Sequence, residues 1–191
     1  MKRVVIERRE RVYDGFFKLD ETHLSYERFD GTMSEPVSRL ALERGDSAAV
    51  LLYRPESKQI VLVNQFRYPT YEKGPGWIVE TLAGVIDPGE DPEDAARREV
   101  LEESGYALRD LVHLSTFYVS PGGSSERIFL YLAEIAESDK VTEGGGRVIE
   151  GEDIVSVELS LADALAQVRS GVIVDAKTIV AIYALQDRIR A

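Results

Sequence analysis

The alternation of apolar and polar residues at the start of the chain predicts a small antiparallel sheet. From residue 3 to about residue 42, short apolar and polar runs alternate, as they do in strands with one buried face. The Asp30-Gly31 pair marks one reversal, because both residues favour tight turns. We therefore expect residues 1–45 to form an N-terminal β subdomain and residues 46–191 to form the main domain.

Stronger apolar runs in the remainder of the chain predict the strands of a larger sheet. Residues 48–53 and 59–66 are separated by a turn-forming Pro-Glu-Ser-Lys segment and have the composition of central strands. Residues 137–152 are acidic, Gly-rich and poorly patterned, which predicts a mobile surface loop. Further strands are expected at residues 77–82, 111–119, 127–135 and 154–159.

Capping residues mark three helices. Asp91 can cap the first, Pro92 suits its first turn, and Gly105 can end it. Ser160 and Asp175 can cap two later amphipathic helices, the second of which runs almost to the last residue.

The composition of the chain restricts which binding partners and which catalytic chemistry are expected. The chain has 191 residues, 44% of them hydrophobic, which is enough for one substantial core. Lys and Arg number 23 against 34 Asp and Glu, so the net charge of -11 disfavours nucleic acid and anionic lipid as partners. The absence of Cys excludes disulfides and thiolate catalysis. With no signal peptide and no apolar stretch of about 20 residues, the expected location is cytoplasmic.

Three carboxylates share one face of the first expected helix. Glu99, Glu102 and Glu103 stand at i, i+3 and i+4, where like charges oppose each other by a few tenths of a kcal/mol per pair in water. A divalent cation would reverse that penalty, and hard oxygen ligands suit Mg²⁺, with Mn²⁺ as a substitute. An isolated acidic doublet is usually only a solvated helix face, so the neighbouring residues decide the interpretation.

Those neighbours resemble the Nudix signature. The segment GVIDPGEDPEDAARREVLEESGY carries seven residues at the fixed spacing of that signature, which at average residue usage arises by chance about once in 10⁸ starts. The resemblance implies an α/β (α+β) Nudix fold, with a mixed β-sheet sandwiched between helices, and a metal-dependent pyrophosphohydrolase. The seven residues are Gly84, Glu90, Arg98, Glu99, Glu102, Glu103 and Gly105.

The resemblance also implies metal ligands. Glu99 and Glu103 would be the main ligands of Mg²⁺, Glu102 a supporting one, and the backbone carbonyl of Ala83 would complete the set. Two or three such ions would neutralise the pyrophosphate and acidify a water molecule that a carboxylate outside the helix orients.

The other signature positions would support the fold of this segment. Glu90 and Arg98 would pair and so hold the preceding loop on the helix. Gly84 and Gly105 would allow the turns at the two ends of the segment.

Outside this segment, the chain resembles the ADP-ribose pyrophosphatase and GDP-mannose hydrolase branch along nearly its whole length. In that branch the N-terminal sheet exchanges between subunits and makes a homodimer. Arg67, at the end of a strand, would bind a substrate phosphate, although it could also simply end that strand in solvent. Residues 120–123, followed by Glu126, have a spacing associated with sugar nucleotides, with a tight hairpin as the alternative.

Residues near the end of the chain would complete the site. After the Gly-rich segment 144–146, Glu152 is the preferred extra metal ligand or general base, and Glu150 is the second choice. The expected catalytic residues are therefore Glu152, Glu150 and Glu103. Lys177 would reach a substrate phosphate, with the partner subunit's site as one option, and Arg39 would be another contact. An ordinary solvated lysine is the alternative for Lys177.

These features predict hydrolysis of GDP-mannose to GMP and mannose 1-phosphate, with ADP-ribose hydrolysis to AMP and ribose 5-phosphate as the alternative. A non-catalytic nucleotide sensor is disfavoured by the intact signature, and an enzyme for capped RNA or triphosphates by the missing basic patch. Phe16, Phe17 and Tyr118 are candidates to stack on the base, but core packing is favoured for each.

Overall fold

The computed structural model describes residues 2–147 and 151–190, and it forms two compact units. The first unit comprises residues 1–46 and 118–127, and the second comprises residues 47–117 and 128–191. Residues 118–127 group with the N-terminal segment because Leu42 donates its N–H to the carbonyl of Gly123 at 2.8 Å. The Oγ of Ser125 also donates to Glu43 Oε2 at 2.6 Å.

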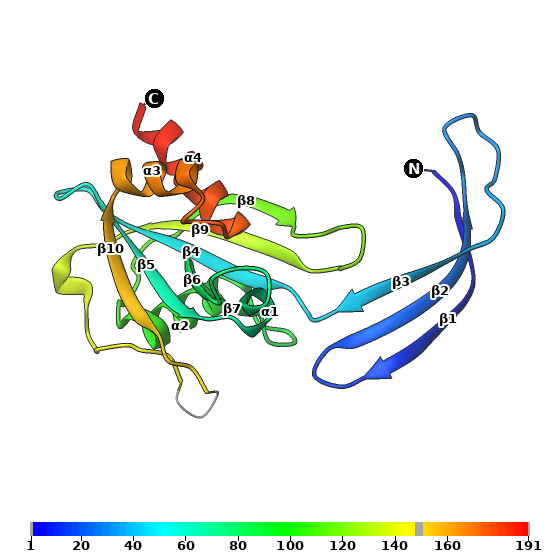
Figure 1. The fold of residues 1–191 in the computed structure, drawn as a ribbon, viewed down its shortest axis with the longest axis horizontal. Coiled ribbons are helices and arrows are strands. Elements are labelled where there is room, and N and C mark those ends of the chain that lie inside the picture. Colours follow the sequence, from blue (N-terminus) through cyan, green and yellow to red (C-terminus); the bar gives the residue numbers. More distant parts are fainter. Residues whose placement is uncertain (1, 148–150, 191) are drawn as a thin grey trace. The chain divides into compact units, whose positions relative to one another are not determined.

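The first unit contains the antiparallel sheet expected from the sequence, in the order β1-β2-β3 (Figure 1). The expected reversal at Asp30-Gly31 is confirmed, because Gly31 has a φ of 85° and Asp30 Oδ1 accepts the N–H of Thr32 at 2.9 Å. The strands are β1 (Val4–Asp14), β2 (Lys18–Tyr26) and β3 (Val37–Glu43).

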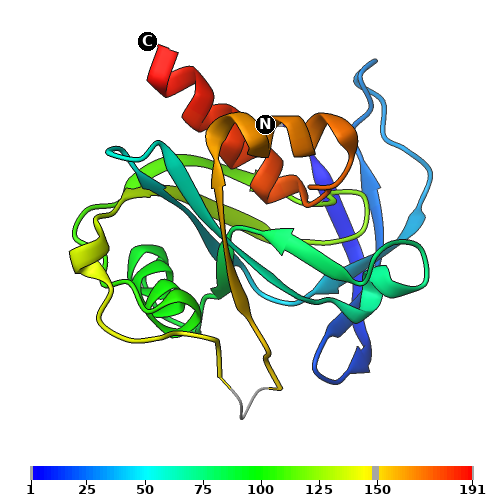
Figure 2. The ribbon, with the colours of Figure 1, turned by 60° about the vertical axis from the view of Figure 1, so that its left-hand side comes forward.

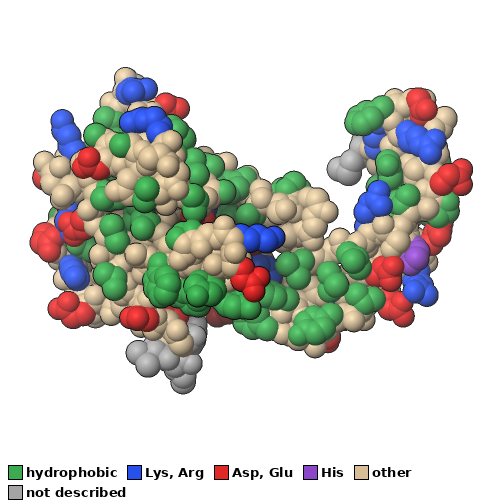
Figure 3. Space-filling view, in the orientation of Figure 1, with side chains coloured by type: hydrophobic (Ala, Val, Ile, Leu, Met, Phe, Trp, Pro, Cys, Tyr) green, Lys and Arg blue, Asp and Glu red, His purple; other side chains and the backbone are tan. Residues whose placement is uncertain are grey.

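Many apolar side chains of this first unit are exposed, and some are visible among the charged ones in Figure 3. The expectation that Phe16, Phe17 and Tyr118 pack in a core is wrong, since Phe16 is 88% exposed and the other two are also exposed. Phe16 and Phe17 lie in the turn between residues 14 and 18, and Tyr118 is the last residue of the strand Val112–Tyr118, so all three stand at strand ends. Exposed apolar residues of the strands include Val4, Val5, Ile6, Val12, Tyr13 and Leu40.

The second unit is built on a mixed sheet in the order β10-β5-β4-β9-β8. Strand β4 lies in the middle, antiparallel to β5 and parallel to β9, so the two strongest apolar runs are interior strands as expected. The strands are β4 (Ser47–Arg54), β5 (Gln59–Phe66), β8 (Val112–Tyr118), β9 (Arg127–Glu134) and β10 (Val155–Ser160).

The single strand expected over residues 77–82 is divided. Strand β6 (Trp77–Glu80) pairs with β5, and β7 (Leu82–Val85) pairs with β4. The break falls at the fully buried Thr81, whose N–H donates to Thr178 Oγ1 at 2.7 Å instead of to a neighbouring strand. A short helix that the sequence analysis did not predict, α1 (Tyr68–Tyr71), connects β5 to β6.

Three longer helices begin at the expected capping residues. Asp91, Ser160 and Asp175 each accept a backbone N–H of the first helical turn, at 2.8, 3.0 and 2.9 Å. In the described part of the chain, no helix has the length and apolar character needed to cross a membrane. The helices are α2 (Pro92–Ser104), α3 (Leu161–Ser170) and α4 (Ala176–Arg190).

The mixed sheet lies between helices, which confirms the expected fold class. Helix α2 covers one face, while α3 and α4 cover the other (Figures 1 and 2). Successive residues of a strand point to opposite faces, so β4 contributes to both cores. Its residues Ala48, Val50 and Leu52 pack on the α2 side, and Ala49, Leu51 and Tyr53 pack on the α3 and α4 side.

Candidate active site

Glu103 is the most deeply buried carboxylate on helix α2. It is 2% exposed, and its Oε2 accepts the N–H of Ala83 in β7 at 3.2 Å. Burial raises the pKa of Glu103 to about 8, and the negative charges of Glu99 and Glu152 act in the same direction. A buried carboxylate among like charges is held in an environment that disfavours its ionised form.

Glu99 lies one helical turn before Glu103 and is partly buried. Its Oε1 accepts from Arg98 Nη1 at 2.5 Å, and Glu102 lies 3.9 Å from the same guanidinium. Burial raises the pKa of Glu99, with smaller contributions from Glu102 and Glu152, although Arg98 opposes the shift. Both buried carboxylates therefore favour a bound proton or a bound cation.

Gly84 is required for a different reason from the expected turn. It lies within β7, opposite Ala48 of β4, and its φ is not left-handed. A Cβ on Gly84 would lie 1.9 Å from Cδ and 2.0 Å from Oε1 of Glu99. The expectation for Gly84 is thus corrected, because this glycine leaves space for the carboxylate of Glu99.

The expected pair between Glu90 and Arg98 is formed. Arg98 donates through Nε to Glu90 Oε1 at 3.0 Å and through Nη2 to Oε2 at 2.9 Å. Glu90 Oε2 also accepts the N–H of Asp87 at 2.9 Å, while Arg98 Nη2 donates to the carbonyl of Val85 at 3.1 Å. These contacts connect the loop before α2 to the middle of the helix.

A Gly-rich segment closes the C-terminal end of α2. Gly105 has a φ of 79° and donates to the carbonyl of Leu101, as a left-handed C-cap does. The N–H groups of Gly145 and Gly146 then donate to the carbonyls of Glu103 and Glu102 at 2.8 and 3.1 Å. These bonds satisfy carbonyls that a helix end leaves without partners inside the helix.

The same segment brings Glu152 close to the helix carboxylates. Glu152 Oε2 accepts the N–H of Arg147 at 2.8 Å, and the charge of Glu152 contributes to the raised pKa of both Glu99 and Glu103. The second candidate, Glu150, lies outside the described residues.

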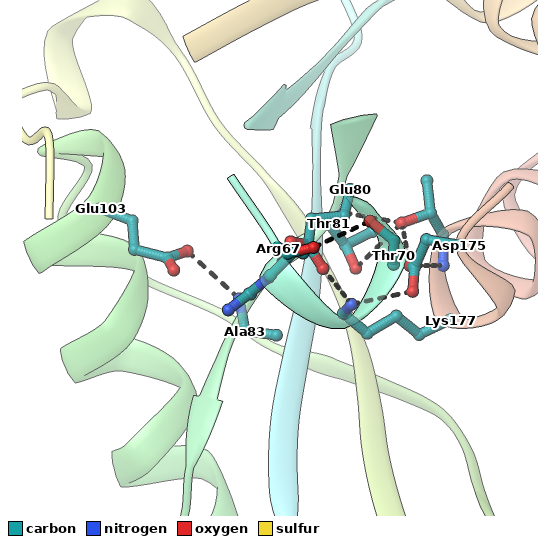
Figure 4. A network of polar contacts seen from close by, with 9 residues as sticks. Arg67, Thr70, Glu80, Thr81, Ala83, Glu103, Asp175 and Lys177 are labelled. Carbon is teal, nitrogen blue, oxygen red and sulfur yellow. Dashed lines mark hydrogen bonds and ion pairs between the residues drawn. The ribbon is translucent and has the colours of Figure 1, made fainter. Parts of the chain in front are cut away.

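Arg67 lies beside these carboxylates and is bound to a residue that the sequence analysis missed, Glu80 (Figure 4). Glu80 is 3% exposed; its Oε1 accepts from Arg67 Nε at 2.7 Å, and its Oε2 accepts from Lys177 Nζ. A single Glu among apolar strand residues carries no sequence signal for two cationic partners that lie elsewhere in the chain.

Lys177 is not the ordinary solvated lysine that was the alternative to a phosphate contact. Its ammonium lies between Glu80 and Asp175 of its own chain, 3.0 Å from Asp175 Oδ1, and the side chain is mostly buried. These two carboxylates occupy two of the three N–H donors of the ammonium, which leaves one donor for a further acceptor.

The remaining two candidates belong to the first unit. Arg39 is in β3, and its Nη1 donates to the carbonyl of Ser38 at 2.9 Å. Glu126 is mostly buried and pairs with Arg44 at 3.2 Å. Their roles in substrate binding stay predictions.

The donor set of the second unit fits a hard divalent cation. Glu99, Glu103 and Glu152 are carboxylates whose like charges repel one another, and burial together with the charges of Glu99 and Glu152 raises the pKa of Glu103. Among residues 2–147 and 151–190, no three acidic or His side chains stand in the arrangement of a preformed metal site. The carboxylates of Glu99 and Glu103 are instead bonded to Arg98 and Ala83.

Known proteins resemble this chain over most of its length. The model of the NUDIX domain family matches residues 43–179. A GDP-mannose pyrophosphatase of Cronobacter sakazakii (strain ATCC BAA-894) is 39% identical, covering 92% of this chain and 91% of its own. One of Escherichia coli O1:K1 / APEC is 37% identical, covering 91% and 90%. A solved ADP compounds hydrolase shares the fold with a TM-score of 0.74 at 20% identity, covering 98% of this chain and 94% of its own.

Proposed function

Because the chain belongs to the Nudix family of hydrolases, we propose that it hydrolyses the pyrophosphate bond of nucleoside diphosphate sugars. GDP-mannose is the proposed substrate, with GMP and mannose 1-phosphate as products, and the name GDP-mannose pyrophosphatase of two curated relatives supports this choice. ADP-ribose, giving AMP and ribose 5-phosphate, is the second candidate, and the fold shared with an ADP compounds hydrolase is compatible with it.

Nudix hydrolases generally use a divalent metal, and we propose Mg²⁺ for this chain. Glu99, Glu103, Glu102, Glu152 and the carbonyl of Ala83 are the proposed ligands. A bound divalent ion supplies charge neutralisation at the pyrophosphate and lowers the pKa of a bound water.

The side chains have separate proposed tasks in the hydrolysis. Glu152, or Glu150 as second choice, accepts a proton from the attacking water while the oxygen of that water forms a bond to one phosphorus. The bond between that phosphorus and the bridging oxygen breaks, and the bridging oxygen leaves with the other phosphate. Arg67 donates hydrogen bonds to a phosphate oxygen and so offsets the charge of the substrate.

One observation carries the proposal. The like charges of Glu99, Glu103 and Glu152 act on one another, and the pKa of Arg67 is raised by Glu80 and further by Glu103 and Glu152. A magnesium pyrophosphate complex offers cations to the carboxylates and oxygens to the arginine, so it matches both halves of this arrangement.

The substrate is tested by measuring phosphate release, after coupling to phosphatase, across a panel of substrates with Mg²⁺. We expect kcat/KM for GDP-mannose to exceed that for ADP-ribose and to exceed that for nucleoside triphosphates by at least about tenfold. Preference for ADP-ribose would move the assignment to the second candidate. Preference for triphosphates would contradict the proposed substrate class.

We also propose that the first unit makes a homodimer. The exposed apolar side chains of β1 and β3 support this, because such surfaces are commonly covered by a second subunit. Light scattering at micromolar concentration should give a mass near twice 21.3 kDa. Replacing the half-exposed Ile6 by Glu should shift the mass toward the monomer, and a monomeric unmodified protein would contradict the proposal.

A further inference from the structure

Glu80 is a buried carboxylate that binds two cations from distant parts of the chain. Arg67 reaches it from the end of β5, and Lys177 reaches it from the first turn of α4. Figure 4 shows the three side chains meeting at the end of β6. The free-energy cost of burying this charge is offset by pairing with cations. The position of Glu80 therefore depends on both cations, and Glu80 in turn restrains both of them.

The backbone beside Glu80 is fixed by further bonds to α4. Thr81 donates its N–H to Thr178 Oγ1 at 2.7 Å, and that hydroxyl donates to Asp175 Oδ2 at 2.5 Å. Asp175 also accepts from Lys177 at 3.0 Å. Glu80 therefore sits on a rigid support rather than on a mobile loop.

Arg67 is fixed through its backbone and one edge of its guanidinium. Its N–H donates to the carbonyl of Gly76 at 2.7 Å, and its own carbonyl accepts from Thr70 Oγ1 at 2.9 Å. Glu80 accepts the hydrogen bond from Nε of Arg67, and the remaining guanidinium donors are on the two Nη nitrogens. Because the side chain is 41% exposed, these donors can meet a ligand from solvent.

The carboxylates proposed to bind metal also attract Arg67. The charges of Glu103 and Glu152 both act on its guanidinium, in addition to that of Glu80. Without the bond from Nε to Glu80, the guanidinium would be drawn toward Glu103 and Glu152 and would compete there with a divalent ion.

We infer that Glu80 is a positioning residue for substrate binding, which rests on the proposed function. It holds the guanidinium of Arg67 ready for a substrate phosphate and prevents it from pairing with Glu103 and Glu152. Lys177, in turn, holds the carboxylate of Glu80 in place from the opposite side through an ion pair with its second oxygen.

The test is a cycle of Glu80→Gln and Arg67→Ala, with kcat and KM for GDP-mannose measured at saturating Mg²⁺. Glu80→Gln should raise KM about tenfold and change kcat less than about threefold, because it misplaces a group that binds the phosphate. In the Arg67→Ala background, the same substitution should change KM less than about twofold. The matched control is Glu158→Gln, which breaks an ion pair with Arg54 elsewhere in the same unit and should leave both constants unchanged.

The inference is overturned if Glu80→Gln leaves KM unchanged, or if it lowers kcat/KM equally with and without Arg67. The second outcome would indicate a role in folding alone. If Glu80→Gln does not fold, Glu80→Gln combined with Lys177→Met, which removes both charges, takes its place in the cycle. Failure of the proposed function is separate, because the unmodified enzyme would then cleave no nucleotide sugar in the substrate panel.

Discussion

Replacing Glu103 by Gln is expected to lower turnover by about three orders of magnitude or more, as loss of a metal ligand in a pyrophosphohydrolase should. The amide keeps the shape of the side chain, and its oxygen can still accept the N–H of Ala83. It removes the negative charge that the cation needs. Steady-state assays with GDP-mannose across a series of Mg²⁺ concentrations measure the effect.

The same substitution should stabilise the protein when a chelator removes divalent ions. The pKa of Glu103 is about 8 in the folded chain and near 4.5 in the unfolded one. Between these values the folded state binds the extra proton, so the stability of the unmodified protein falls as pH rises from about 4.5 to about 8. Gln has no such dependence. The unfolding temperature of Glu103→Gln should therefore exceed that of the unmodified protein by more at pH 8 than at pH 5.

A second substitution on the same helix separates these effects from a general change of charge. Glu93 lies in the first turn of α2 with an exposed side chain, so Glu93→Gln should keep turnover within about twofold. Near-normal turnover of Glu103→Gln at saturating Mg²⁺ would show that Glu103 is not a metal ligand. If the difference in unfolding temperature between Glu103→Gln and the unmodified protein were the same at pH 8 and pH 5, burial would not be the cause of the raised pKa of Glu103.

Local signals were sufficient to predict most of the fold. The interior strands followed from apolar runs, and the three longer helices followed from Asp91, Ser160 and Asp175, because caps act within one turn of the chain. The pair of Glu90 with Arg98 was also predicted, since both residues belong to one short signature.

Interactions between distant residues could not be predicted in this way. The strand break at Thr81 depends on Thr178, which is 97 residues away. Glu80 acquires its importance from two cations on other elements, and Lys177 is buried by the same contact. Spacing along the chain contains no information about such pairs, so Lys177 was expected to face a substrate directly.

Replacing Gly84 by Ala should lower kcat/KM by about a hundredfold, although the substitution adds only one methyl group to a strand. The new Cβ would stand within 1.9 to 2.3 Å of the carboxylate atoms of Glu99, so that carboxylate must move. Strand β7 should persist, because the φ of Gly84 is one that Ala also adopts. Higher Mg²⁺ should be needed for half-maximal activity, while the unfolding temperature changes little.

A shorter side chain at position 99 distinguishes this steric cause from damage to the strand. Glu99→Asp withdraws the carboxylate by one methylene, which leaves space for the new methyl group. Gly84→Ala should then lower kcat/KM by less than about fivefold relative to Glu99→Asp alone, since the two substitutions act on one contact. An equal loss in both backgrounds would mean that the methyl group disturbs β7 and its pairing with β4. Glycine would then be needed for the strand, and the space it leaves for Glu99 would be incidental.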